Sequence, residues 1–124
     1  MTATTDLTST LPAAATCGTV ELHTARGWFA VCPADALQPG RGVAALLPDG
    51  QQAALFRDRT GRLYAIGNVD PFTGAAVLSH GLTGSDGDRP YVASPLLKQR
   101  FGLADGRCLD DEGVAVASYP VRVS

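Results

Sequence analysis

The chain has 124 residues, of which 45% are hydrophobic and 18% are charged, and its formal net charge is -2. This length favours one domain with a modest core. The basic residues are scattered singly, without the positive stripe that nucleic-acid-binding proteins use to neutralise phosphates, so binding driven by phosphate charge is not expected. The 14 glycines and 8 prolines favour short elements joined by tight turns, which is typical of a β-rich fold.

The first 19 residues are rich in threonine and alanine and contain no basic residue. They lack the charged start and the apolar centre of a secretory signal peptide. The apolar runs along the rest of the chain are far shorter than the ~20 residues that cross a bilayer. We therefore expect residues 1–19 to form a disordered tail and residues 20–124 to form the folded domain of a cytoplasmic protein.

Short β-like runs alternate with turn signals from residue 27 onward, and helical periodicity is nearly absent. Turn residues at 48–50 and 58–61 predict two hairpins, and 33–37 can form a single helical turn. Polar, glycine-containing loops are expected over 68–78 and 81–90. The candidate strands cover 28–32, 41–47, 51–57, 62–67, 91–93, 99–103, 107–109, 114–117 and 121–123. So many short strands predict an all-β antiparallel sandwich or barrel.

Side chains that bind soft metals are scarce in this sequence. The cysteines and histidines are Cys17, His23, Cys32, His80 and Cys108, and no two of them lie within four residues of each other. An odd number of cysteines without a CxxC pair predicts neither a disulfide framework nor a zinc ribbon. We expect these thiols to be reduced.

The stretch from Tyr64 to Leu109 resembles a Rieske ferredoxin domain. In that fold, one loop carries a Cys-x-His motif and a second loop carries Cys-x-x-His, and together they hold a [2Fe-2S] cluster. Asp70-Pro71-Phe72 stands where Cys-Pro-His would be, and Ser94-Pro95-Leu96-Leu97 stands where Cys-Pro-x-His would be. The resemblance implies a Rieske-like fold with two loops of the cluster-binding type.

The four positions that correspond to cluster ligands hold other residues, namely Asp70, Phe72, Ser94 and Leu97. Iron bonded to inorganic sulfide takes thiolate or imidazole ligands, and phenylalanine and leucine have no donor atom. Asp70 and Ser94 alone offer two hard oxygens, too few for a calcium or magnesium site. We therefore expect neither a [2Fe-2S] cluster nor any other metal on this chain.

A closer resemblance is to the small-subunit family of assimilatory NAD(P)H-dependent nitrite reductases. It covers residues 27–123 and is carried by the segments 67–72, 77–79, 94–99, 108–110 and 119–121. His80 departs from the family pattern, in which arginine is expected. The resemblance implies a non-catalytic accessory subunit. Its partner would be a large subunit that carries FAD, an iron-sulfur cluster and sirohaem and that reduces nitrite to ammonium with electrons from a nicotinamide.

Two expectations concern the tips of the loops. Phe72 and Leu97 are expected to face each other and to replace the metal as an apolar clasp, or else to be exposed as a partner surface. Lys98, Gln99 and Arg100 are candidate contacts for acidic groups on the large subunit, and a solvated strand end is the alternative.

Other functions remain open at this point. One is a genuine Rieske-type electron-transfer ferredoxin, and another is a module that binds a small molecule in the vacated cluster cavity. A hydrolase built from Asp70, His80 and Ser94 is disfavoured because the sequence has no GxSxG motif. The acidic run 110–112 is expected to be a solvated turn.

Overall fold

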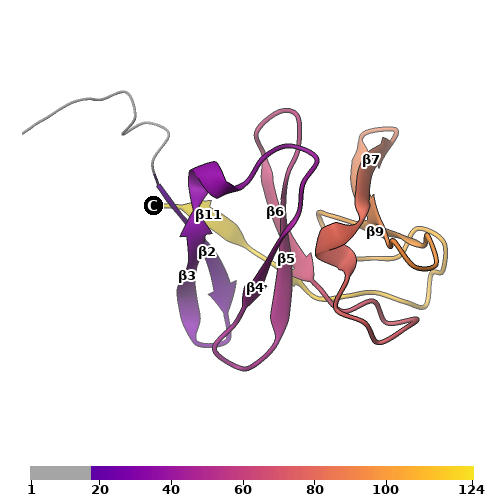
Figure 1. Cartoon of the computed structure of the whole chain (residues 1–124), viewed down its shortest axis with the longest axis horizontal. Helices are drawn as coiled ribbons and strands as arrows, with labels where there is room; N and C mark the ends of the chain where they lie inside the picture. The colour runs from indigo at the N-terminus through magenta and orange to yellow at the C-terminus, as the bar shows by residue number, and fades with distance from the viewer. Residues whose placement is uncertain (1–17) are drawn as a thin grey trace, which may run out of the picture.

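The computed structural model describes residues 18–124, and residues 1–17, including Cys17, lie outside that description. Ten strands form three antiparallel sheets and are joined by two short 3-10 helices (Figure 1). The strands are β2 (Thr19–Thr24), β3 (Gly27–Pro33), β4 (Val43–Leu46), β5 (Gln52–Arg57), β6 (Leu63–Gly67), β7 (Leu82–Asp86), β8 (Arg89–Ala93), β9 (Arg100–Gly102), β10 (Ser118–Tyr119) and β11 (Val121–Val123). The helices are η1 (Ala34–Ala36) and η2 (Leu78–His80). The predicted all-β class is confirmed.

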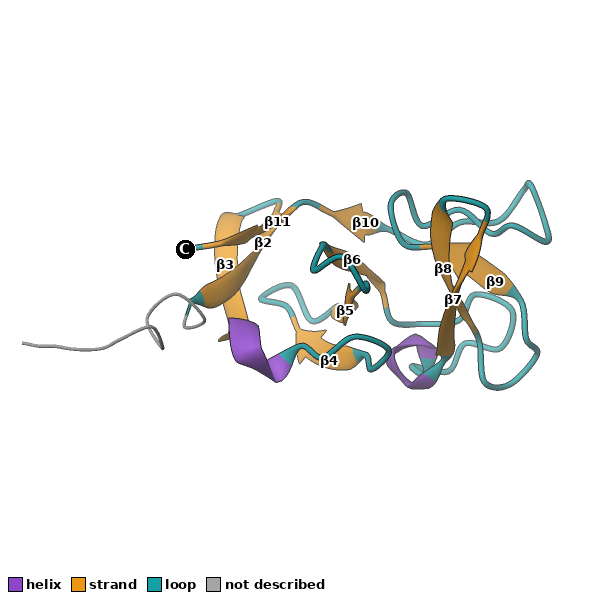
Figure 2. Cartoon of the chain, turned by 90° about the horizontal axis from the view of Figure 1, so that it is seen from above, coloured by secondary structure: helices purple, strands orange, loops and turns teal. Residues whose placement is uncertain are grey.

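The three sheets lie one after another along the molecule. The order is β11-β2-β3 in the first, β10-β6-β5-β4 in the second and β7-β8-β9 in the third. Figure 2 shows the first sheet at one end, the second in the middle and the third at the other end. The N–H of Thr19 donates to the carbonyl of Ser124 at 3.1 Å, so the start of β2 and the C-terminus lie together at the first end.

The two predicted hairpin turns are confirmed, one between β4 and β5 and the other between β5 and β6. Gly50 has a φ angle of 87° and Gly61 one of 92°, which other residues rarely adopt. At the second turn the Asp58 carboxylate accepts hydrogen bonds from the Thr60 hydroxyl at 2.7 Å and from the Arg62 N–H at 2.9 Å. The hydrogen bond from the Thr60 hydroxyl is the main cause of a lowered pKa at Asp58, and the bond from the Arg62 N–H lowers this pKa further.

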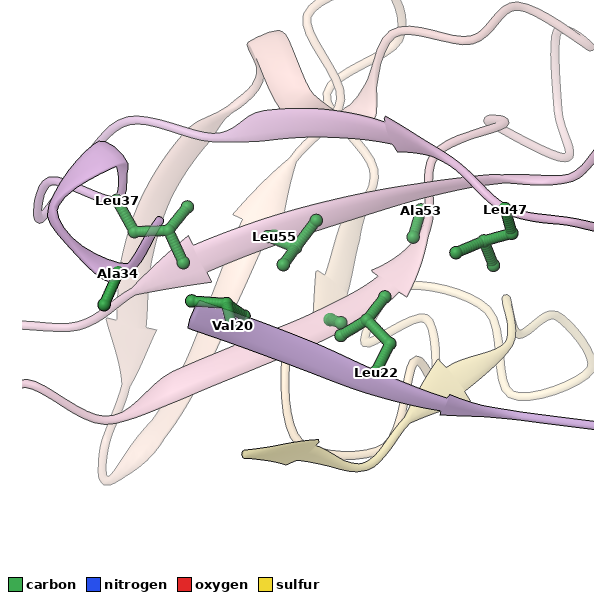
Figure 3. Packing of buried hydrophobic residues seen from close by; sticks show 8 residues of the cluster. Val20, Leu22, Ala34, Leu37, Leu47, Ala53 and Leu55 are labelled. Carbon is green, nitrogen blue, oxygen red and sulfur yellow. The ribbon is translucent and has the colours of Figure 1, made fainter. Parts of the chain in front are cut away.

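Strand β5 is buried on both of its faces, which explains its continuous apolar run. Ala53 and Leu55 pack between the second sheet and the first (Figure 3), and Ala54 and Phe56 pack between the second sheet and the third. We call these two clusters the sandwich core and the loop-side core. The sandwich core comprises Val20, Leu22, Ala34, Leu37, Leu47, Ala53, Leu55 and Ala65. The loop-side core comprises Ala54, Phe56, Ile66, Leu78, Val92, Phe101, Leu103 and Cys108.

Three strands were not predicted from the sequence, namely β2, β7 and the two-residue strand β10. Strand β2 begins at Thr19, within the segment expected to be a tail, and its buried Val20 and Leu22 alternate with Glu21 and His23. Strand β7 lies in the segment 81–90 that was expected to be a loop. It pairs only with β8 and is largely exposed, so its residues need no apolar alternation.

Two other segments that were expected to be strands form only isolated bridges. Segment 107–109 pairs with β9 through Phe101 and Cys108. It meets segment 114–117 through the isolated pairing of Arg107 with Ala115 and through the Cys108 N–H, which donates to the carbonyl of Val114 at 3.0 Å. Gly106, directly before the first segment, lies so close to the second that an added Cβ would be 2.2 Å from the carbonyl oxygen of Val116. No helix within residues 18–124 is long and apolar enough to cross a membrane.

Candidate functional site

Two loops meet at the end of the molecule that carries the third sheet. The first loop, residues 68–77, connects β6 to η2, and the second loop, residues 94–99, connects β8 to β9. The buried polar residues of the described chain are Asn68, Asp70, Ser79 and Ser94, each 5% exposed or less. All four lie in these loops or directly beside the first one, so polar burial is concentrated at this site.

Asp70 and Ser94 join the two loops. The Ser94 hydroxyl donates a hydrogen bond of 2.6 Å to Oδ2 of Asp70, and the Phe72 N–H donates one of 2.8 Å to Oδ1. Both side chains are 0% exposed. Asp70 and Ser94 stand at the two positions that the resemblance aligns with cysteine ligands, and their side chains bond directly to each other.

Further hydrogen bonds hold the first loop in place. The Asp70 carbonyl accepts from the N–H of Gly74 at 2.7 Å, and Gly74 has a φ angle of 76° that favours glycine. At the start of the loop, Oδ1 of Asn68 accepts from the N–H of Ser79 at 2.7 Å. The Asn68 amide donates to Oε1 of Gln52 at 3.0 Å, which fastens the loop to β5.

The second loop closes on itself. The N–H of Ser94 donates to the carbonyl of Gln99 at 2.9 Å, and the N–H of Lys98 donates to the carbonyl of Ser94 at 3.0 Å. Lys98 has a φ angle of 68° and is the one residue other than glycine with a positive φ in the part of the chain that the structure describes. This left-handed conformation is costly for a residue with a side chain, and here it lets the loop close within six residues.

The structure does not support the apolar clasp that was expected between Phe72 and Leu97. The Phe72 ring packs against the loop-side core, with its centroid 6.2 Å from that of Phe101. Leu97 is 52% exposed, so it contributes little to holding the loops together. The direct link between the loops is the polar contact of Asp70 with Ser94, although the sequence pattern indicated these two residues only as degenerate ligand positions.

The three candidate partner contacts differ in their surroundings. Arg100 donates to the Asp110 carboxylate, with Nη2 2.8 Å from Oδ1, and this bond lowers the pKa of Asp110. Its charge is therefore already paired, and the expectation that Asp110 is merely solvated is corrected. Gln99 is partly buried, and its Oε1 has no hydrogen-bond partner among the described residues. Lys98 is exposed.

The donor atoms at this site do not fit a [2Fe-2S] cluster. Asp70 and Ser94 bond each other through oxygen, and Phe72 and Leu97 have no donor atom. Cys108 is buried in the loop-side core and Cys32 lies on β3 in the first sheet, so neither thiol belongs to the two loops. Residues 18–124 contain no group of three or more His, Cys, Asp or Glu side chains that could hold a metal ion.

The geometry also argues against a hydrolase and against a small-molecule site in a vacated cluster cavity. Ser94 donates directly to Asp70 and is fully buried, while His80 is exposed, so these three residues do not form a hydrolytic triad open to substrate. A cavity of about 710 Å³ lies between the hairpins β5–β6 and β7–β8. None of the four residues at the ligand positions lines it, so it is not the cavity of a missing cluster.

Comparison with known proteins identifies the family to which this fold and site belong. A family model described as a Rieske-like [2Fe-2S] domain matches residues 27–124. The small subunit of nitrite reductase (NADH) from Salmonella typhimurium is 46% identical over 97 residues, which cover 77% of this chain and 89% of that protein. A crystal structure from Mycobacterium tuberculosis, assigned as an NADH-dependent nitrite reductase small subunit, superimposes with a TM-score of 0.73 at 50% identity. It covers 85% of this chain and 86% of the other.

A third relative carries the matching region within a much longer polypeptide. The large subunit of nitrite reductase [NAD(P)H] from Klebsiella oxytoca is 45% identical over 98 residues, which are 79% of this chain and 10% of that one. The similarity to separate small subunits extends over most of their length, and the fold is the same. This chain therefore belongs to the Rieske-like [2Fe-2S] domain family and, within it, to the small subunits of NADH-dependent nitrite reductase.

Proposed function

We propose that this chain is the accessory small subunit of a cytoplasmic NAD(P)H-dependent nitrite reductase and that it acts without an iron-sulfur cluster of its own. The observation that carries this proposal is the hydrogen bond of 2.6 Å between Ser94 and Asp70. In a Rieske centre, two cysteine thiolates bind one of the two irons. Here the two corresponding side chains satisfy each other and are sealed from solvent.

The partner in this proposal is the reductase large subunit. Support comes from the Klebsiella oxytoca protein, in which a matching region makes up 10% of a large-subunit polypeptide. On the family resemblance, the large subunit carries FAD, an iron-sulfur cluster and sirohaem, which supply the redox chemistry that turns nitrite into ammonium. The small subunit contributes no reacting group in this scheme. It contributes a rigid surface, because its loops are fixed by buried hydrogen bonds.

Co-expression with the large subunit tests the partnership. We expect the two chains to co-purify, and we expect nitrite-dependent NAD(P)H oxidation to fall when this chain is omitted. The large subunit alone and the large subunit with an unrelated small β protein serve as controls. If this chain neither binds the large subunit nor changes its turnover, the proposal is wrong.

The second candidate function is a Rieske-type electron carrier, which the match to a [2Fe-2S] domain family favours. Iron content and colour separate it from the first. We expect the chain purified without oxygen to be colourless and free of stoichiometric iron, whereas a genuine Rieske ferredoxin from the same host is loaded and coloured. About two irons per chain with a visible absorption band would establish the carrier instead.

A further inference from the structure

We propose that the second loop and the neighbouring residue Leu82 form the surface that docks on the reductase large subunit. This inference rests on the proposed function and adds the location of the contact. Leu82, Leu96 and Leu97 are 73%, 50% and 52% exposed. Exposed apolar residues that lie together on a folded domain mark a site of interaction with another protein.

The three leucines lie toward the same end of the third sheet. Leu82 in β7 pairs with Ala93 in β8, the residue directly before the second loop. Ala93 pairs in turn with Arg100, the residue directly after that loop. Leu82 is therefore at the base of the loop that carries Leu96 and Leu97. We call Leu82, Leu96, Leu97 and Lys98 the docking surface.

The docking surface is held rigid before any partner arrives. The loop closes through Ser94 with Gln99 and through Lys98 with Ser94, and the Leu96 N–H also donates to the Ser94 hydroxyl at 3.3 Å. The strained backbone of Lys98 follows directly after the two leucines. A surface that is already ordered loses less conformational entropy on binding, so such a loop is suited to recognition.

Charge indicates the kind of partner surface that fits. Arg100 is paired with Asp110, whereas Lys98 forms no ion pair with a described residue. With respect to residues 18–124, the docking surface thus presents apolar side chains beside the unpaired ammonium group of Lys98. Its complement is an apolar patch with a carboxylate at its edge.

The opposite end of the molecule is less suited to be the main contact. There Arg122 lies over the Trp28 ring at 4.1 Å and is ion-paired with Glu21 at 2.6 Å, so its charge is already paired. The start of β2 and Ser124 also lie at that end. In a polypeptide such as the Klebsiella oxytoca large subunit, where the matching region is joined covalently to the rest, a connection at that end leaves the docking surface free to turn toward the remainder of the enzyme.

The test measures binding of the full chain to the purified large subunit. In the double variant Leu96→Ser with Leu97→Ser, we expect the Kd to rise at least about tenfold, because a few buried apolar anchors carry most of the affinity of an interface. Leu46→Ser is the matched control, since Leu46 is 67% exposed but lies on β4, away from the docking surface. We expect its Kd to stay within about twofold of the wild-type value.

A second variant keeps the test valid if the double variant does not fold. Thermal unfolding reports whether each variant is folded, and Lys98→Glu alters only an exposed charge. We expect Lys98→Glu to slow association at low salt and to lose that effect at high salt. An unchanged Kd in the folded double variant, or an equal loss in Leu46→Ser, would overturn the docking surface while the subunit function stands. Failure of the wild-type chain to bind would overturn both.

Discussion

The two cores of this small domain are built differently, although they share the strand β5. The sandwich core consists of aliphatic side chains from the first two sheets and from residues that follow β3 and β4, and it includes no buried polar side chain. The loop-side core contains Phe56 and Phe101 and is bordered by the four buried polar residues of the two loops. Apolar packing can be satisfied by many arrangements, whereas hydrogen bonds require particular partners and directions. Both cores therefore contribute stability through apolar packing, and the loop-side core in addition fixes the position of two loops.

The largest expected losses of stability come from two adjacent residues on β5, one in each core. Leu55→Ala should lower the free energy of unfolding by about 2–5 kcal/mol and Phe56→Ala by about 3–5 kcal/mol, because both side chains are fully buried. Chemical denaturation measures both losses. Hydrogen exchange then shows whether the cores separate: Phe56→Ala should lower the protection of β8 and β9 more than that of β2 and β3. Equal losses of protection in both sheets would mean that the two cores behave as one.

The bond between Asp70 and Ser94 is the next largest effect. Asp70→Ala leaves the buried Ser94 hydroxyl and the Phe72 N–H without their acceptor, which should cost about 1–3 kcal/mol. Ser94→Ala removes the other partner. In the double variant we expect a total loss smaller than the sum of the single losses, by about 1 kcal/mol or more, measured as a double-mutant cycle in urea. Simple additivity would show that this bond does not hold the loops together.

Phe72 and Leu97 test which loop residues belong to the loop-side core, because both were expected to form an apolar clasp. Phe72→Ala should cost about 2 kcal/mol, less than a fully buried phenylalanine, since the ring is only partly buried against the loop-side core. Leu97→Ala should change stability by less than about 0.5 kcal/mol, because Leu97 is exposed. Denaturation midpoints measure both. A large and coupled loss in the two variants would restore the apolar clasp.

The smallest expected effect is the pH dependence that comes from Asp110. Hydrogen bonds from the Arg100 side chain, and then from its backbone N–H, lower the pKa of Asp110 in the folded chain. The pair therefore contributes stability above the unfolded pKa of about 3.9, and this contribution is lost as the pH falls through the lowered folded value. The side chains are 35% and 37% exposed, so salt weakens the effect.

The variant Asp110→Asn provides the measurement for that pair. We expect the wild-type protein to be slightly more stable than the variant near neutral pH and equal to it once the pH lies below the folded pKa of Asp110. Urea midpoints followed from about pH 7 to well below the unfolded pKa of about 3.9 measure this loss. A difference that persists at the acidic end would mean that the aspartate acts through its shape or hydrogen bonding alone.

Several features of this protein follow from local sequence alone. The glycine turns at Gly50 and Gly61, the β-rich class and the run of apolar residues in β5 are set by backbone preferences and by side-chain period, which neighbouring residues determine. The sequence also determines that no thiolate or imidazole stands at Asp70, Phe72, Ser94 or Leu97, because that is a matter of residue identity. The strand β2 carries a readable alternation, but its position next to the threonine-rich segment hid it.

Other features were decided only by the tertiary structure. Asp70 and Ser94 are 24 residues apart, and they bond because the middle and third sheets bring their loops together. The same packing places Phe72 on the loop-side core and leaves Leu97 at the surface, although both are apolar loop residues. Pairing of Arg100 with Asp110 likewise depends on a turn between β9 and the following segment. A sequence specifies which groups can bond, and the packing of distant elements decides which of them come into contact.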